Sequence, residues 1–210
     1  MNQLAIISAI VLLLSACSTP VSEQVRRLQS AACCATPQDL RPVETISSER
    51  SGELSESSSI ISIDAGRAPA IALRLPEGSN GRILEIHATP DMGAVTRGGS
   101  LIFAPVSIAF ITADGKTIAP SEDSGINPAH GGALYSFILA RQVRVPQLAV
   151  SAVFYSDPSK IGTSQTMAHK TSSYLMPAGG LLIPMTGRSS VTAIYAVYGK
   201  FSVQLLNPKN

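Results

Sequence analysis

The chain has 210 residues, of which 45% are hydrophobic and 14% charged, and its formal net charge is +2. This composition can bury a core, so it excludes a chain that is disordered throughout. The net charge is small and no Lys/Arg cluster is longer than Arg26-Arg27, which argues against nucleic acid as a partner.

An apolar run from Leu4 to Cys17 lies at the start of the chain. It is shorter than the roughly 20 residues that cross a bilayer as a helix, and it has the length of the hydrophobic region of a secretory signal. Its last residues, Leu14-Ser15-Ala16-Cys17, resemble the lipobox of bacterial lipoproteins. The resemblance implies cleavage before Cys17 and lipidation of its thiol, so we expect residues 1–16 to be a signal peptide. The alternative is a buried N-terminal helix.

The sequence after Cys17 indicates where the protein is held. No later apolar run approaches membrane-spanning length, so we expect the lipid to be the membrane attachment. Ser18, rather than Asp, follows Cys17 and resembles the signal for sorting to the outer membrane. We therefore expect a periplasmic protein that is anchored to the outer membrane by an N-terminal lipid.

Residues 17–59 are expected to form a lipidated tether and an irregular lead-in. The polar segment 18–30 includes a short expected helix from Ser22 to Leu28, and the Ser/Glu-rich segment 47–59 is typical of a loop. Cys33 and Cys34 are neighbours in a chain expected to be exported, and disulfides persist in that compartment. Three states stay open for them: a bridge between the two, an intermolecular bridge, or two buried thiols.

From residue 60 onward, short apolar and β-branched runs alternate with turn signals and predict one β-domain over residues 60–210. Asn80-Gly81 predicts a hairpin, as do residues 114–116. Pro105 predicts a bulge, a bend or an edge inside the apolar run 101–111. We expect an all-β fold, an antiparallel, jelly-roll-like β-sandwich of about eight or nine short strands, which include 60–63, 70–75, 82–89, 147–156, 191–198 and 201–206.

The polar stretch 156–180 is expected to be a long surface loop, and loops of this length are often functional. Tyr155 and Tyr174 lie at or near its ends, and His169 and Lys170 lie inside it. A Tyr ring can stack on a sugar, while Lys and His can donate hydrogen bonds to its hydroxyl oxygens. These four residues are the candidate ligand-binding set, and the alternative is that the Tyr residues belong to the core or to an interface.

Sequence motifs for catalysis and metal binding are absent. His87, His130 and His169 are far apart and match no metal-binding motif. His130-Gly131-Gly132 resembles an esterase oxyanion loop, but no G-x-S-x-G nucleophile motif accompanies it. We therefore expect a protein that is not an enzyme and needs neither a cofactor nor a metal.

Several short segments, taken in order, resemble the maltose operon periplasmic protein family. They are Ala32-Cys33-Cys34 with residues 39–43, the strand 70–76 ending in Leu-Pro, residues 102–106 with 114–116, the strand and loop 152–162, and residues 179–182. The resemblance covers about residues 31–206. It implies an exported envelope protein associated with carbohydrate uptake, and it supplies no catalytic residues.

Two functions are therefore considered. The first is assistance to the uptake of maltose or maltodextrin-type sugars, with an oligosaccharide as ligand and an envelope transport protein as partner. The second is a structural or interaction lipoprotein that binds a protein partner without a sugar. It would do so through an exposed strand edge or through the strand that carries Tyr195 and Tyr198.

Replacing Cys17 by Ala tests the lipid anchor. Cells that express the natural chain should incorporate radiolabelled palmitate into it, and Cys17→Ala should abolish the label because the acceptor thiol is gone. Labelling that survives the substitution would contradict the anchor.

Overall fold

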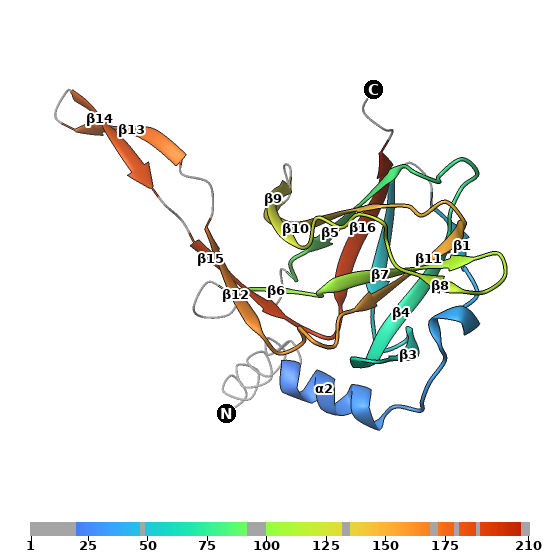
Figure 1. Cartoon of the computed structure of the whole chain (residues 1–210). Coiled ribbons are helices and arrows are strands. Elements are labelled where there is room, and N and C mark those ends of the chain that lie inside the picture. The colour runs from blue at the N-terminus through green and yellow to red at the C-terminus, as the bar shows by residue number, and fades with distance from the viewer. Residues whose placement is uncertain are drawn as a thin grey trace, which may run out of the picture.

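The computed structural model describes residues 20–46, 49–91, 100–131, 135–168, 172–178, 181–187 and 190–206. Of residues 130–131, 135–136, 168, 172–178 and 181–187 it describes the backbone alone. These ranges contain sixteen strands, one α-helix and one 3-10 helix, which confirms the all-β fold (Figure 1). Within them, no helix has both the length and the apolar character needed to cross a membrane.

The first large sheet has six strands. Its order is β1 (Glu44–Thr45), β4 (Gly66–Arg74), β11 (Ala149–Ser156), β7 (Val106–Thr112) and β8 (Thr117–Ile118), and β3 (Ser59–Ile63) also pairs with β4. All pairs are antiparallel except β1 with β4, which is parallel.

The second large sheet has five strands, all antiparallel to their neighbours. Its order is β2 (Glu49–Leu54), β16 (Gly199–Leu206), β5 (Ile83–Thr89), β10 (Tyr135–Arg144) and β9 (Asn127–Gly131). The strand that comes last in the chain therefore lies between two early ones.

Two smaller sheets extend from this body. In one, β15 (Ser190–Tyr195) pairs with β12 (Ser164–Ala168) and, in parallel, with β6 (Leu101–Phe103). The other is the hairpin of β13 (Ser172–Ala178) and β14 (Leu181–Gly187), which projects away from the body beyond β12 and β15 (Figure 1).

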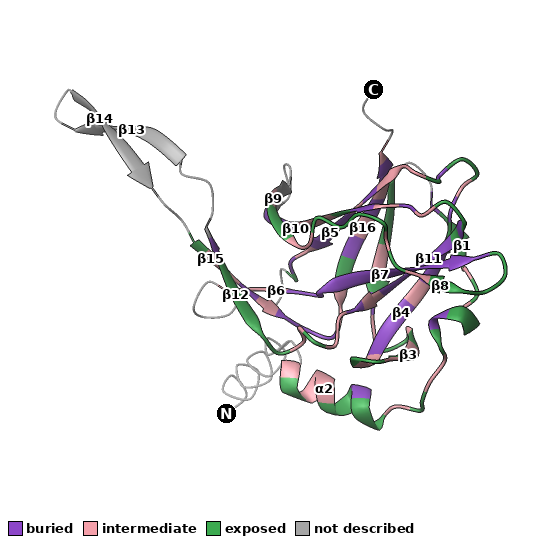
Figure 2. Cartoon of the chain, in the orientation of Figure 1, coloured by how far each residue is buried: buried purple, intermediate pink, exposed green. Residues whose placement is uncertain are grey.

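The two large sheets share one hydrophobic core. Phe110 and Phe154 of the first sheet belong to the same buried cluster as Leu84 and Phe201 of the second. The rings of Phe154 and Phe201 lie 5.3 Å apart, between the sheets. Buried residues follow the strands of both sheets in Figure 2. The sheets therefore lie on either side of one core, and the finer description as a jelly-roll sandwich stays a prediction.

The other face of the first sheet is also covered, by the segment that follows the helix. This outer face carries small side chains such as Ala68, Ala70 and Ala72, which form a second buried cluster with Ile61, Ile111 and Val153. Ala35 and Leu40 pack on that cluster, and the backbone N–H of Val43 donates to the carbonyl of Ala72 at 3.1 Å. The small side chains let the covering segment lie close to the sheet.

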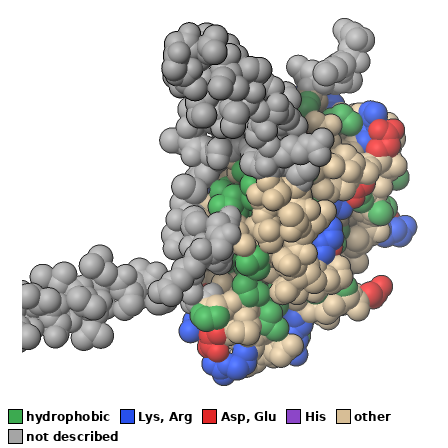
Figure 3. Space-filling model, turned by 90° about the vertical axis from the view of Figure 1, so that its left-hand side faces the viewer, with side chains coloured by type: hydrophobic (Ala, Val, Ile, Leu, Met, Phe, Trp, Pro, Cys, Tyr) green, Lys and Arg blue, Asp and Glu red, His purple; other side chains and the backbone are tan. Residues whose placement is uncertain are grey.

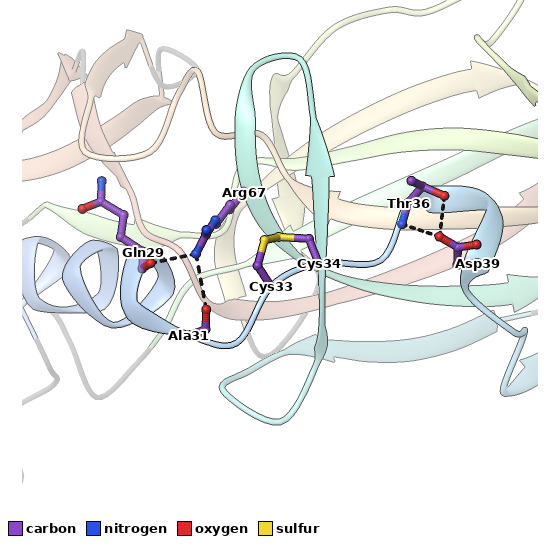
Figure 4. Close-up of a disulfide and its surroundings, with 7 residues drawn as sticks. All are labelled: Gln29, Ala31, Cys33, Cys34, Thr36, Asp39 and Arg67. Atoms are coloured by element: carbon purple, nitrogen blue, oxygen red, sulfur yellow. Dashed lines mark hydrogen bonds between the residues drawn. A yellow bond between two sulfur atoms is a disulfide. The ribbon is translucent and has the colours of Figure 1, made fainter.

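Helix α2 (Val21–Ser30) is docked on β4 at its C-terminal end, and the 3-10 helix η1 (Pro37–Asp39) follows it in the chain. The guanidinium of Arg67 donates to the carbonyls of Gln29 and Ala31 at 2.7 and 3.3 Å (Figure 4). These carbonyls lie at the helix end, where they have no partner within the helix. The same view shows Cys33 and Cys34 joined to each other by a disulfide, the first of the three states left open above.

The expected tether and lead-in over residues 17–59 are therefore wrong for most of their length. The short helix is present, but it is docked, and residues 49–54 form β2 instead of a loop. Leu28, Ile46 and Leu54 are buried, so the folded unit begins well before residue 60. The polar composition of β2 misled the prediction because β2 is an edge strand with most of its residues exposed.

Other turn and loop predictions had mixed outcomes. The hairpin at residues 114–116 is confirmed by the pairing of β7 with β8, and Pro105 does separate two strands, β6 and β7. The hairpin at Asn80-Gly81 is wrong, because the turn there leads from β4 in one sheet to β5 in the other. The expected loop 156–180 is wrong as well, since it contains β12 and β13.

One arginine ties the two large sheets together. Arg141 of β10 donates to the carbonyl of Val106 and the hydroxyl of Ser107 in β7, at 3.2 and 3.0 Å. Its other nitrogens donate to both carboxylate oxygens of Asp123. The side chain of Arg141 is 15% exposed and that of Asp123 is 30% exposed, so this bidentate pair is partly shielded from water.

Replacing Gly52 by Ala should lower the free energy of unfolding by about 1–3 kcal/mol, the usual cost of overpacking a core. Gly52 lies opposite Phe201, and a Cβ there would come within 2.6 Å of the ring. Urea denaturation measures the effect. The control is Ser51→Ala on the exposed neighbour in the same strand, which should change stability by less than about 0.5 kcal/mol. Equal stability of the two variants would contradict this packing.

The Asp123 carboxylate should stabilise the fold more at neutral than at acidic pH. Hydrogen bonds from Arg141 hold the pKa of Asp123 below its ordinary value. The stabilisation is therefore complete above the unfolded-state pKa of about 3.9 and is lost as pH falls through the lower folded-state pKa. Measured by urea denaturation, Asp123→Asn should be less stable than the natural chain at neutral pH, with the gap narrowing in acid. A gap that stays constant with pH would contradict the linkage.

Candidate binding groove

The four residues of the candidate ligand-binding set do not form one site among the described residues. Tyr155 lies in β11, half-buried, and packs against the second cluster on the outer face of the first sheet. Tyr174 lies in the projecting β13, opposite Met185. His169 and Lys170 lie outside the described residues. Because β11 belongs to the body and β13 to the hairpin, the structure does not bring the two Tyr residues together (Figure 1).

The strand expected to offer Tyr195 and Tyr198 to a partner is not an exposed edge. Strand β15 is paired on both sides, with β12 and with β6. Tyr195 is buried, and its hydroxyl donates to the side chain of Gln165 at 3.0 Å. Burial raises the pKa of both Tyr195 and Tyr198. Addition of a partner strand to β15 is therefore excluded, because the strand already pairs on both sides, and Tyr198 lies outside the strand and is half-buried. The interaction role itself stays a prediction.

A groove of about 680 Å³ lies at one end of the first sheet. Three segments line it: Gln38 of η1 with residues 40–42, residues 74–80 from the end of β4 onward, and the adjoining ends of β7 and β11 at residues 111–112 and 149–151. These segments meet because β4, β11 and β7 are neighbours and the covering segment runs beside them. The groove is thus built from parts of the chain more than 100 residues apart.

Two arginines give the groove its charge. Arg41 and Arg74 line it, both are exposed, and Glu77 is the one carboxylate among the described lining residues. The other described arginines all have protein partners: Arg26, Arg27, Arg50, Arg141 and Arg144 in salt bridges, and Arg67 and Arg82 on backbone carbonyls. For Arg41 and Arg74 the described residues provide neither a salt bridge nor a side-chain hydrogen bond.

Exposed aliphatic side chains border the same groove. Val150 belongs to its lining and is 43% exposed, and Leu148, two residues earlier, is 73% exposed. Val43, which directly follows the lining residue Pro42, is also 73% exposed. These three are the large hydrophobic residues that the described chain leaves exposed. Aliphatic surface beside unpaired guanidiniums is typical of a surface that binds another molecule.

Sequence reasoning missed this groove because its residues carry no local signature. Arg41 lies before a proline in what was expected to be an irregular lead-in, and Arg74 ends a strand. The one usable signal was a charged residue at the end of an otherwise apolar strand, Ala70 to Leu75.

In comparisons with known proteins, no family model, curated protein or solved structure matches the chain. The resemblance to the maltose operon periplasmic protein family therefore stays a prediction. In the described part of the chain, no three His, Cys, Asp or Glu residues are grouped so as to hold a metal ion.

Proposed function

We propose that the chain is a non-enzymatic lipoprotein of the periplasm, anchored to the outer membrane through Cys17, which binds an extended acidic segment of an envelope protein in the groove. The observation that carries the proposal is the pair of unpaired guanidiniums, Arg41 and Arg74, beside exposed aliphatic side chains. Since the described residues give these two groups no acidic partner, they are free to bind an acidic ligand.

The chemistry of the groove favours a peptide with carboxylates. Arginine binds a carboxylate through two parallel hydrogen bonds, which fixes the direction of the ligand as well as its affinity. Leu148 and Val150 offer apolar contact next to these charges. An extended segment that alternates acidic and aliphatic residues satisfies both, with its carboxylates on the arginines and its aliphatic groups on the rim.

An oligosaccharide fits the groove less well. Sugar sites in proteins commonly use an aromatic ring, whose apolar face covers the sugar, and the described lining of this groove contains no Phe or Tyr. Assistance to carbohydrate uptake, the role implied by the family resemblance, would then act through the protein partner and not through a bound sugar.

A photo-cross-linking amino acid in place of Leu148 tests the proposal in intact cells. It should give one discrete adduct with an envelope protein. The adduct should weaken with the double substitution Arg41→Ala and Arg74→Ala, since loss of hydrogen bonds to a charged group weakens binding roughly tenfold or more. The matched control is Arg26→Ala, which removes an exposed arginine of α2, outside the groove lining, and should leave the adduct unchanged.

The sugar alternative predicts the opposite set of results. Maltodextrins would then raise the melting temperature of the purified chain, the double arginine substitution would abolish that shift, and no adduct would form at position 148. That combination would overturn the proposal.

A further inference from the structure

The projecting hairpin, residues 172–187 and here named the arm, has an unusual composition. No charged residue occurs between Lys170 and Arg188. The register pairs Leu175 with Pro184, and towards the tip it continues with Met176–Ile183, Pro177–Leu182 and Ala178–Leu181. Successive residues of a strand alternate between the two faces, so near its tip the arm is apolar on both faces.

The arm's position in the fold leaves these faces without a cover from the described strands of the two large sheets. Figure 1 shows β13 and β14 extending beyond the stem of β12 and β15, away from both large sheets. A two-stranded hairpin by itself is at best marginally stable in water. The arm, with strands about 23 Å long at 3.3 Å per residue, therefore needs apolar surroundings from outside the chain.

The edges of the arm are unsuited to pairing with another strand. Proline has no N–H, so a proline inside a paired strand occupies a position whose nitrogen faces away from the partner strand. Pro177 pairs with Leu182, and Pro184 pairs with Leu175, two residues further along the ladder. Pairs two residues apart have the same hydrogen-bonding pattern, so the nitrogens of both prolines face away from the partner strand. Each outer edge thus lacks a donor, which is a device that blocks strand addition. An apolar medium suits the arm better than a second sheet.

The stem of the arm lies beside the helix nearest to the lipid anchor. A hollow is lined by Val25 and Leu28 of α2 together with Pro158 and Ile161, which precede β12. The side chain of Gln24 accepts a hydrogen bond from the backbone of Val197, just after β15. Figure 3 shows the face on this side of the molecule, where basic and acidic side chains lie at the lower end and along the right-hand side.

The tether between the lipid and this helix is very short. Only residues 18–20 separate Cys17 from the start of α2 at Val21. The four residue-to-residue steps from Cys17 to Val21 span at most about 14 Å. A lipid on Cys17 therefore holds the start of α2, and the stem beside it, close to the surface of the bilayer.

We propose that the apolar tip of the arm inserts into the interfacial region of the same bilayer that holds the lipid, as a second membrane contact. The inference rests on the lipid anchor of the proposed function. Insertion is shallow, because the backbone edges of a lone hairpin find water only near the headgroups.

The chain contains no Trp, so a single introduced Trp is a unique fluorescent reporter. Leu182→Trp places it near the tip, and Met185→Trp places a second reporter further down the same strand. In the full lipidated chain bound to phosphatidylethanolamine/phosphatidylglycerol vesicles, the emission of both should shift to shorter wavelength. Brominated lipids should quench position 182 more strongly than position 185. The matched control is Leu148→Trp in the distant groove, which should show neither effect.

The lipid anchor is tested separately from insertion of the arm, by incorporation of radiolabelled palmitate and by co-sedimentation of the chain with vesicles. Co-sedimentation of the Leu182→Trp chain with its fluorescence unshifted and unquenched would overturn the arm's insertion while leaving the anchor intact. The fluorescence of the Leu182→Trp chain could instead shift without vesicles, increasingly so at higher protein concentration, with dimers seen in sedimentation velocity. That result would also overturn insertion, because a second copy of the chain would then cover the arm. Loss of palmitate label with the reporter at position 182 still quenched would overturn the anchor alone.

A charge placed in the arm gives an independent check of insertion. Adding Ile183→Asp to the Leu182→Trp chain should weaken quenching of the reporter roughly tenfold or more, because a carboxylate is expensive to place in lipid. Quenching that is unchanged by this carboxylate would contradict insertion of the tip.

Discussion

The fold depends on the first sheet being buried on both faces. One face contributes Phe110 and Phe154 to the core shared with the second sheet, and the other carries a layer of alanines. A sheet of this kind cannot face water on either side without exposing apolar surface. It therefore requires two covers, and the second is supplied by the segment from α2 to β1. The groove lies where residues 40–42 of that cover meet the ends of β4, β7 and β11.

The sequence allowed the all-β class and most of the inner strands to be predicted, because their apolar runs are local signals. The strands predicted at 147–156 and 201–206 are present as β11 and β16, although β11 begins only at Ala149, and the reason is the one expected, burial of alternate or successive apolar side chains. The polar edge strand β2 and the docked helix α2 could not be predicted in the same way. Their stability comes from distant partners, Phe201 for Gly52 and Arg67 for the helix end.

The candidate site could be predicted even less. Tyr155 carried a plausible pattern for a sugar site, yet its position on β11 places it against the alanine layer. Arg41 and Arg74 line one groove only through the path of the covering segment, which nothing in the sequence around either residue indicates. The apolar arm is the reverse case. Its lack of charge is plain in the sequence, but its isolation from the body is visible only in the structure (Figure 1).

The place of β16 has a consequence for how the protein is made. Strand β16 lies between β2 and β5, so residues near 54 and 88 cannot form their backbone pairs until residues near 201 are present. Contacts so distant in sequence form slowly. A chain that is made from its N-terminus onward cannot complete the second sheet until residue 206 is available. Until then the core faces of β2 and β5 lack β16, and the incomplete chain is open to aggregation or in need of a chaperone during this interval.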